Sequence, residues 1–182
     1  MSTTKYILHG GFRPGEKQVS DSFFKEVLSE VIDGAKVLIV YFATDNGDRY
    51  FPEDVEQFNT NSGGKNLVFE RASEDRFEYQ VREADVIYLH GGSSTPLLDV
   101  LKKFPSFPEL IKGKTIAGDS AGANYLSTVF YSRRNGVGEG LGILPIKIIP
   151  HFVEENRDKL SQVHPELKTL FLPEYHYEVI IV

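Results

Sequence analysis

The stretch TIAGDSAGANYLS, residues 115–127, joins a short apolar run to a helix-like segment through a tight turn. Its centre, Gly118-x-Ser120-x-Gly122, matches the nucleophile-elbow pattern, in which a sharp strand-to-helix turn holds a serine hydroxyl above a sheet. The small residues around the serine let the strand and the helix approach each other. Two other interpretations stay open from these residues alone, an anion-binding turn and a purely structural connection. No lysine follows Gly122, which excludes a P-loop.

The rest of the chain alternates between short apolar runs and segments with helical periodicity. Several runs are apolar without alternation, which is typical of strands buried on both faces of a sheet. The predicted strands are residues 6–8, 36–42, 66–69, 85–89, 114–117, 146–149, 168–172 and 178–182. The predicted helices are residues 20–34, 50–59, 74–83, 94–103, 121–131 and 155–163. This order predicts an α/β fold with a mostly parallel central sheet flanked by helices, formed by residues 1–182 as one domain, with residues 133–140 as a mobile loop.

Composition excludes several classes of function. The net charge is −6 and the basic residues are scattered, which argues against nucleic acid or an anionic membrane as partner. The chain has no cysteine, so disulfides, zinc–thiolate sites and a cysteine nucleophile are excluded. Neither a signal peptide nor a membrane-spanning segment is recognisable in the sequence, and we expect a cytoplasmic protein.

Four polar or glycine-rich motifs follow predicted strands. They are His9-Gly10-Gly11, His90-Gly91-Gly92-Ser93-Ser94, Asp119-Ser120-Ala121-Gly122 and Pro150-His151-Phe152. Ligands of open α/β sheets bind outside the carboxyl ends of the strands. We therefore expect these motifs to form one site.

A serine nucleophile needs a general base, and histidine is the most common one. His151 directly follows the run 146–150, at a strand end near the elbow, and it is the leading candidate. His9 and His90 precede glycine pairs and are expected to line the site, whereas His164 is expected to be exposed.

The base in turn needs a group that orients it. Glu174 stands immediately after the strand 168–172 and is the leading candidate. An alternative places Glu154 or Glu166 with His176. Asp119 is a poor candidate, because the residue beside a nucleophile generally projects away from it.

An oxyanion hole needs two backbone N–H donors. Ala121 N–H, at the start of the helix after Ser120, is one candidate, and the glycine pair Gly91-Gly92 offers the second. A plain turn before the helix near Thr95 is the alternative interpretation of the glycine pair.

The motifs also carry a family resemblance. Leu89-His-Gly-Gly-Ser-Ser-Thr-Pro-Leu-Leu98, Gly118-Asp-Ser-Ala-Gly-Ala-Asn124, Pro150-His-Phe152 and Leu172-Pro-Glu174 occur in the order seen in peptidase E. The chain thus resembles the aspartyl dipeptidases, serine peptidases with a class I glutamine amidotransferase-like fold, a flavodoxin-like three-layer arrangement. The resemblance implies a serine peptidase that cleaves small peptides, including N-terminal aspartyl dipeptides, without a cofactor or metal.

What the resemblance implies for individual residues is a Ser–His–Glu triad. Ser120 would be the nucleophile, His151 the base and Glu174 its orienter. The remaining implied residues are Gly92 and Ala121 in the oxyanion hole and Gly91, Ser93, Asn124 and Arg157 in substrate binding, with Arg133 and Arg134 as alternatives for recognising a substrate aspartate.

The sequence departs from the family at some positions. The second motif reads Gly-Gly-Ser where the family usually has Gly-Gly-Asn, and an acidic side chain at Asp119 would repel an acidic substrate if it faced the site. Two alternatives therefore remain, a non-catalytic binding or regulatory protein and an amidase or esterase acting on a non-peptide substrate. The sequence does not determine the oligomeric state, and a homodimer is one alternative.

Overall fold

Six strands form the main sheet of the computed structural model, which describes residues 3–13, 16–17 and 21–182. In spatial order they are β10 (Tyr177–Ile181), β1 (Lys5–His9), β5 (Thr115–Asp119), β4 (Val86–Leu89), β2 (Lys36–Val40) and β3 (Val68–Arg71). All neighbours pair in parallel except β10, which is antiparallel to β1. Every residue of β1 and β4 is buried, which explains the apolar runs 6–8 and 86–89 within them.

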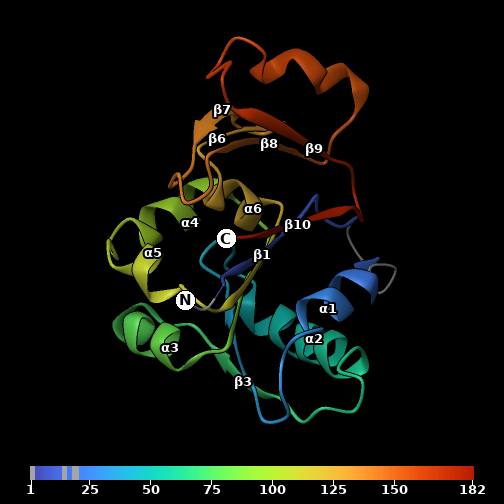
Figure 1. Cartoon of the computed structure of the whole chain (residues 1–182), viewed down its shortest axis with the longest axis vertical. Coiled ribbons are helices and arrows are strands. Elements are labelled where there is room, and N and C mark those ends of the chain that lie inside the picture. The colour runs from blue at the N-terminus through green and yellow to red at the C-terminus, as the bar shows by residue number, and fades with distance from the viewer. Residues whose placement is uncertain (1–2, 14–15, 18–20) are drawn as a thin grey trace.

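Helices cover both faces of this sheet (Figure 1). They are α1 (Asp21–Val27), α2 (Gly47–Thr60), α3 (Phe77–Glu83), α4 (Ser94–Leu101), α5 (Phe107–Leu110) and α6 (Ala121–Leu126), with a 3-10 helix η2 (Glu74–Arg76) before α3. One hydrophobic cluster joins α1 and α2 to the sheet, and another joins α3 to α6 to its opposite face. The predicted mostly parallel sheet flanked by helices is confirmed.

Four further strands form a second sheet that the sequence did not predict as a separate unit. Its order is β7 (Gly136–Glu139), β6 (Val129–Ser132), β8 (Ile146–Pro150) and β9 (Lys168–Leu172). Ile148 and Leu170 belong to the same cluster as α3 to α6, while Ile149 packs with the outer 3-10 helix η3 (Glu154–Leu160). The second sheet therefore shares a hydrophobic core with the main sheet.

Two local predictions were wrong. The helix predicted over 121–131 ends at Leu126, and residues 129–132 form β6 instead. The segment Val129-Phe-Tyr131 is β-branched and aromatic, a composition that favours a strand. The loop predicted over 133–140 contains β7, which pairs antiparallel with β6.

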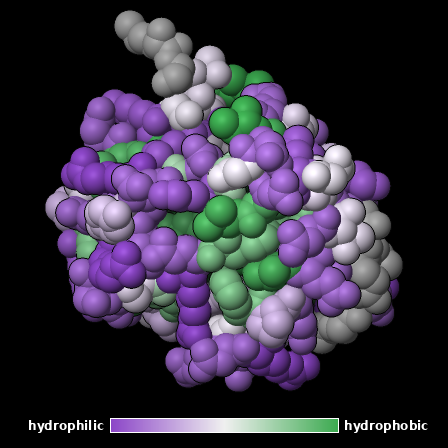
Figure 2. Space-filling model, turned by 90° about the horizontal axis from the view of Figure 1, so that it is seen from below, coloured by the Kyte–Doolittle hydropathy of each residue, from purple (hydrophilic) through white to green (hydrophobic). Residues whose placement is uncertain are grey.

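The outer surface is mainly polar. Figure 2 shows hydrophilic residues over most of the face seen from below, surrounding an apolar area near its centre. No helix in the described parts of the chain has the length and apolar content needed to cross a membrane.

Candidate active site

Ser120 occupies the turn between β5 and α6, with φ 45° and ψ −99°. This conformation is uncommon for a residue with a side chain, and such strain is concentrated at functional sites. Its N–H donates to His9 O at 3.0 Å, which ties the turn to the end of β1. Helix α6 also passes close to β4. A Cβ on Gly122 would lie only 2.2 Å from Leu89 O, so this close approach requires glycine. The turn therefore has the elbow geometry that the sequence predicted.

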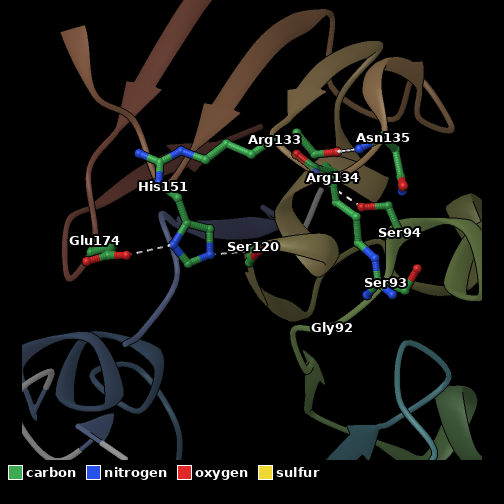
Figure 3. Close-up of a pocket in the computed structure, with 11 residues that line it drawn as sticks. Gly92, Ser93, Ser94, Ser120, Arg133, Arg134, Asn135, His151 and Glu174 are labelled. Atoms are coloured by element: carbon green, nitrogen blue, oxygen red, sulfur yellow. Dashed lines mark hydrogen bonds and ion pairs between the residues drawn. The ribbon is translucent and has the colours of Figure 1, made fainter. Parts of the chain in front are cut away.

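Ser120 begins a chain of hydrogen bonds (Figure 3). Its Oγ lies 3.1 Å from His151 Nε2, and His151 Nδ1 lies 3.2 Å from Glu174 Oε1. A carboxylate only accepts, so Nδ1 carries a proton and Nε2 is free to accept the serine hydroxyl proton. Arg13 Nε donates to Glu174 Oε2 at 2.8 Å, and this hydrogen bond lowers the pKa of the Glu174 carboxyl below its usual range. The arrangement is the one that a serine nucleophile requires.

The loop after β1 holds the histidine and the glutamate in place. His151 N donates to Gly10 O at 2.7 Å, and Tyr175 N donates to Gly11 O at 3.0 Å. Gly11 has φ +104°, and a Cβ there would lie 2.3 Å from His151 Nε2. The imidazole thus rests directly on a glycine that no other residue can replace without displacing the ring.

A pocket of about 230 Å³ opens beside Ser120. Its lining residues are Gly92, Ser93, Ser94, Ser120, Asn124, Ser132, Arg133, Arg134, Asn135, His151 and Glu174. Asn124 Nδ2 donates to Ser94 Oγ at 3.0 Å, while the buried Asn124 Oδ1 has no partner among the described residues. The N–H of Gly92 likewise has no acceptor within the described parts of the chain. Two polar atoms of residues that line the pocket therefore have no hydrogen-bond partner among the described residues: the buried Asn124 Oδ1 and the Gly92 N–H.

Comparison with known proteins matches residues 7–174 to Peptidase family S51. The chain belongs to peptidase family S51. This is a family of serine peptidases, so the chain is a serine-type hydrolase. The comparison with curated proteins finds no match.

Solved structures show the same fold. A protein from Listeria monocytogenes EGD-e, assigned to peptidase E, is 19% identical with a TM-score of 0.68, and the match covers 100% of this chain and 98% of that one. A peptidase from an acI-B1 Actinobacterium is 20% identical with a TM-score of 0.65, covering 97% of this chain and 83% of that one. The S51 chain is thus similar to peptidase E-type structures over its whole length.

Arg133 and Arg134 form the turn between β6 and β7 and are both exposed. Figure 3 shows the Arg134 side chain extending toward Ser93, and the Arg133 side chain extending in the other direction, over His151. Neither guanidinium forms an ion pair with a described residue. The S51 pocket therefore carries two unpaired positive charges at its rim.

Three of the residues that the family resemblance implied for the site do not line this pocket. Arg157 lies on η3, where it pairs with Glu154 and its guanidinium carbon lies 5.0 Å from the Phe171 ring centroid. Gly91 lies against the Asp119 carboxylate, behind the lining residue Gly92. Ala121 is buried at the start of α6, and its role as an oxyanion donor stays a prediction.

Asp119 does not face the pocket. Its side chain is 2% exposed, and its Oδ2 accepts a hydrogen bond from Tyr88 OH at 2.7 Å. Burial, assisted by the Asp119 charge, raises the pKa of the Tyr88 phenol, which therefore keeps its proton. The repulsion of an acidic substrate that the sequence suggested is thus not expected.

The side chains of the other histidines have different surroundings from that of His151. His164 is exposed, as predicted, and bonds to Glu166, while His176 bonds to the backbone oxygen of Glu174. His9 and His90 were expected to line the pocket, but both are buried outside it. The alternative pairing of His176 with Glu154 or Glu166 therefore has no support in this geometry.

Sequence reasoning missed Arg13 and the contacts of the Gly10-Gly11 pair. Arg13 bonds to a residue 161 positions away, and no local pattern marks such a contact. The glycine pair after a buried strand was a usable signal for close backbone approach. Within the described ranges, no group of three or more acidic, histidine or cysteine side chains is placed to hold a metal ion.

His9 makes the fold sensitive to acid. It stacks on Phe12 with ring centroids 4.3 Å apart, and its Nδ1 accepts the Gly11 N–H at 3.0 Å. Burial, opposed by the nearby Asp119 charge, lowers the pKa of His9 to about 4 from 6.5. The unfolded chain therefore binds the proton first, and stability is lost as the pH falls from about 6.5 to about 4. The gap between those two pKa values corresponds to about 3 kcal/mol of unfolding free energy.

We expect His9→Asn to flatten the pH dependence of the unfolding free energy between pH 6.5 and 4, because asparagine can accept the Gly11 N–H and does not titrate there. Urea unfolding at several pH values measures this. The same substitution at the exposed His164 should leave the slope unchanged. Equal slopes for wild type and His9→Asn would contradict the assignment.

Proposed function

We propose that this S51 peptidase hydrolyses small peptides through an acyl-enzyme on Ser120. The supporting observation is the hydrogen-bonded chain from Ser120 Oγ through His151 to Glu174, beside a pocket that Gly92 lines. A non-catalytic protein has no need of a strained serine within hydrogen-bond distance of an oriented histidine.

Acylation uses each of these groups in turn. Ser120 Oγ attacks the substrate carbonyl carbon while its proton moves to His151 Nε2. Glu174 stabilises the imidazolium that results, since it already accepts the Nδ1 proton. The oxygen of the tetrahedral intermediate becomes negative and is bound by the N–H groups of Gly92 and Ala121. The intermediate then expels the amine, which takes the proton from Nε2.

Deacylation repeats the sequence with water as the nucleophile. His151 Nε2 removes a proton from the water as it attacks the ester carbonyl, and then returns that proton to Ser120 Oγ. The products are an amine, a carboxylic acid and the unmodified serine. The exposed fraction of the His151 side chain is 33%, so water can reach this position.

The substrate that the pocket fits best has an acidic N-terminal residue. Arg133 and Arg134 bring unpaired guanidinium groups, which bind carboxylates well. Glu174, the acidic residue on the lining, is already paired with Arg13. We therefore propose a dipeptidase specific for N-terminal aspartyl residues.

A panel of dipeptides tests this function, with Asp-Leu and Asn-Leu as the first pair and Ser120→Ala as the blank. The expected result is hydrolysis of Asp-Leu well above the blank. Hydrolysis limited to simple esters or amides would instead show an esterase or amidase. Binding of Asp-Leu without turnover of any substrate would show a binding protein.

Arg134→Gln should reduce the preference for the acidic substrate. We expect kcat/KM for Asp-Leu to fall by about tenfold to thirtyfold, because a charged hydrogen bond is replaced by a neutral one. The kcat/KM for Asn-Leu should change little, because its amide side chain carries no charge. Arg157→Gln is the matched control and should affect neither substrate. An equal decrease of kcat/KM for both substrates in Arg134→Gln would show that Arg134 does not recognise the acidic side chain.

A further inference from the structure

A buried polar cluster lies beside the Gly91-Gly92 turn and has no part in the hydrogen-bonded chain of Ser120. It consists of Lys17, Tyr41, Asp54 and His90. The side chain of Asp54 is fully buried, and those of His90 and Lys17 are only 9% and 17% exposed. Placing ionisable groups in the interior is costly unless they are paired and hydrogen-bonded. The cluster therefore needs a structural or functional explanation.

The hydrogen bonds in the cluster fix where its protons lie. His90 Nδ1 is 2.8 Å from Gly91 O, which can only accept, so Nδ1 carries a proton. His90 Nε2 is 3.0 Å from Lys17 Nζ, which can only donate, so Nε2 accepts. These two contacts favour the tautomer with its proton on Nδ1, and Asp54 Oδ2 lies farther from Nε2, at 3.6 Å.

Asp54 keeps the lysine in this position. Its Oδ1 forms a close ion pair with Lys17 Nζ, and its Oδ2 accepts from Tyr41 OH at 2.7 Å. The His90 ring is also confined by aromatic neighbours, since the ring centroids of Tyr41 and Tyr50 both lie 4.9 Å away. The imidazole is thus held in one orientation, with Nδ1 toward Gly91 O.

The Gly91–Gly92 peptide links this cluster to the pocket. In a trans peptide the C=O and N–H groups point in opposite directions, so a carbonyl bonded to His90 directs the Gly92 N–H away from His90. Gly92 lines the pocket with Ser120, and its N–H has no acceptor among the described residues. A hydrogen bond to the carbonyl also polarises the N–H of the same peptide and makes it a better donor.

The next residues anchor the turn from the other side. Ser93 N donates to Ala43 O at 2.8 Å, and a Cβ on Gly92, at φ +148°, would lie 2.4 Å from that same oxygen. The turn therefore lies tightly against Ala43, and the remaining freedom is rotation of the Gly91–Gly92 peptide. The hydrogen bond from His90 removes that freedom.

We propose that His90 is a positioning residue for the oxyanion hole, which fixes and polarises the Gly91–Gly92 peptide while Lys17 and Asp54 hold its Nδ1–H tautomer. This inference rests on the proposed function, because it assigns Gly92 N–H to the oxyanion of the Ser120 reaction. No proton leaves the cluster during the reaction. Its effect falls on the transition state, where the charge on the substrate oxygen develops.

Two substitutions of His90 separate this role from simple packing. His90→Leu removes the donor, whereas His90→Asn places an amide N–H close to the former position of Nδ1–H. For His90→Leu we expect kcat to fall on the order of tenfold with KM nearly unchanged, since one oxyanion donor is weakened rather than removed. The affinity for a peptide boronic acid, which forms a tetrahedral adduct, should fall by a similar factor. His90→Asn should recover kcat to within about threefold of wild type.

Three outcomes would overturn the proposal: a wild-type kcat in His90→Leu, an equally low kcat in both variants, or a change confined to KM. His164→Leu is the matched control, because that histidine is exposed and distant from the cluster, and it should behave as wild type.

A measurement on the unmodified protein covers the case in which the variants fail to fold. Nitrogen-15 NMR of labelled histidine at pH 7.5 should show His90 with a protonated Nδ1 and an unprotonated Nε2. If the protein hydrolyses peptides but His90 is the opposite tautomer or an imidazolium, the positioning role of His90 is overturned and the proposed function is not. The predicted tautomer in a protein without hydrolytic activity would overturn the proposed function, and with it the oxyanion role of His90.

Discussion

Ser120→Ala is expected to lower kcat by about 10⁴-fold or more while the protein stays folded. The substitution removes the atom that attacks the substrate, so neither the base nor the oxyanion donors can act on a covalent intermediate. The hydroxyl makes its hydrogen bond to His151, at 3.1 Å, and the side chain is only partly buried. We therefore expect little change in the melting temperature.

Steady-state kinetics on Asp-Leu and thermal unfolding of both proteins measure these two quantities. Ser161→Ala is the matched control, because Ser161 is exposed and its hydroxyl donates to the nearby Asp158 O. It should retain wild-type kcat. A Ser120→Ala enzyme that keeps more than about a tenth of wild-type kcat would contradict the nucleophile assignment.

Gly11→Ala has the second-largest expected effect, although Gly11 does not line the pocket. The new Cβ would lie 2.3 Å from His151 Nε2 and Cε1, so the ring must leave the position in which Nε2 bonds to Ser120 Oγ. A displacement of about 1 Å between reacting groups costs about a hundredfold in rate. We expect kcat to fall by about 10²-fold or more and phosphonylation of Ser120 to slow by a similar factor.

The chain supplies a close control for the backbone strain of this substitution. Gly34 also has a positive φ, +81°, but a Cβ there would meet no atom within 4 Å. Gly34→Ala should therefore lose on the order of 1 kcal/mol of unfolding free energy from strain while keeping its activity. Equal kcat values for Gly11→Ala and Gly34→Ala would show that Gly11 does not support the histidine.

The parts of the site with local sequence signals could be predicted. The elbow around Ser120 is defined by five adjacent residues, and His151 and Glu174 each follow an apolar run that ends a strand. Parallel strands bring their carboxyl ends to one edge, which places such residues together even when they are far apart in the chain.

Other parts depend on contacts that sequence periodicity does not encode. Arg13 lies in the loop after β1 and bonds to Glu174, which is far away in the sequence. Arg133 and Arg134 lie at the pocket because residues 129–139 form a hairpin. The sequence pattern predicted one helix over 121–131 and therefore no hairpin there, although the composition of Val129-Phe-Tyr131 favours a strand. The short helix α6 ends at Leu126, because Ser127 adopts an extended conformation there.

The role of His90 illustrates the same limit. Its position before a glycine pair predicted a residue that lines the pocket, but the structure shows a buried ring that contacts Gly91 O and Lys17. Lys17 and Asp54 come from separate segments, and neither is marked by a motif. Only the three-dimensional arrangement shows that an ion pair lies behind the Gly91-Gly92 turn.

The central claim, that Ser120 is the nucleophile, is tested most directly by labelling the protein with a fluorophosphonate and mapping the adduct by peptide mass spectrometry. We predict one adduct, on the peptide that contains Ser120, formed by the folded protein and absent from Ser120→Ala. His151→Asn should slow its formation strongly, because the general base is lost. An unlabelled wild-type protein, or an adduct on another residue, would contradict the claim.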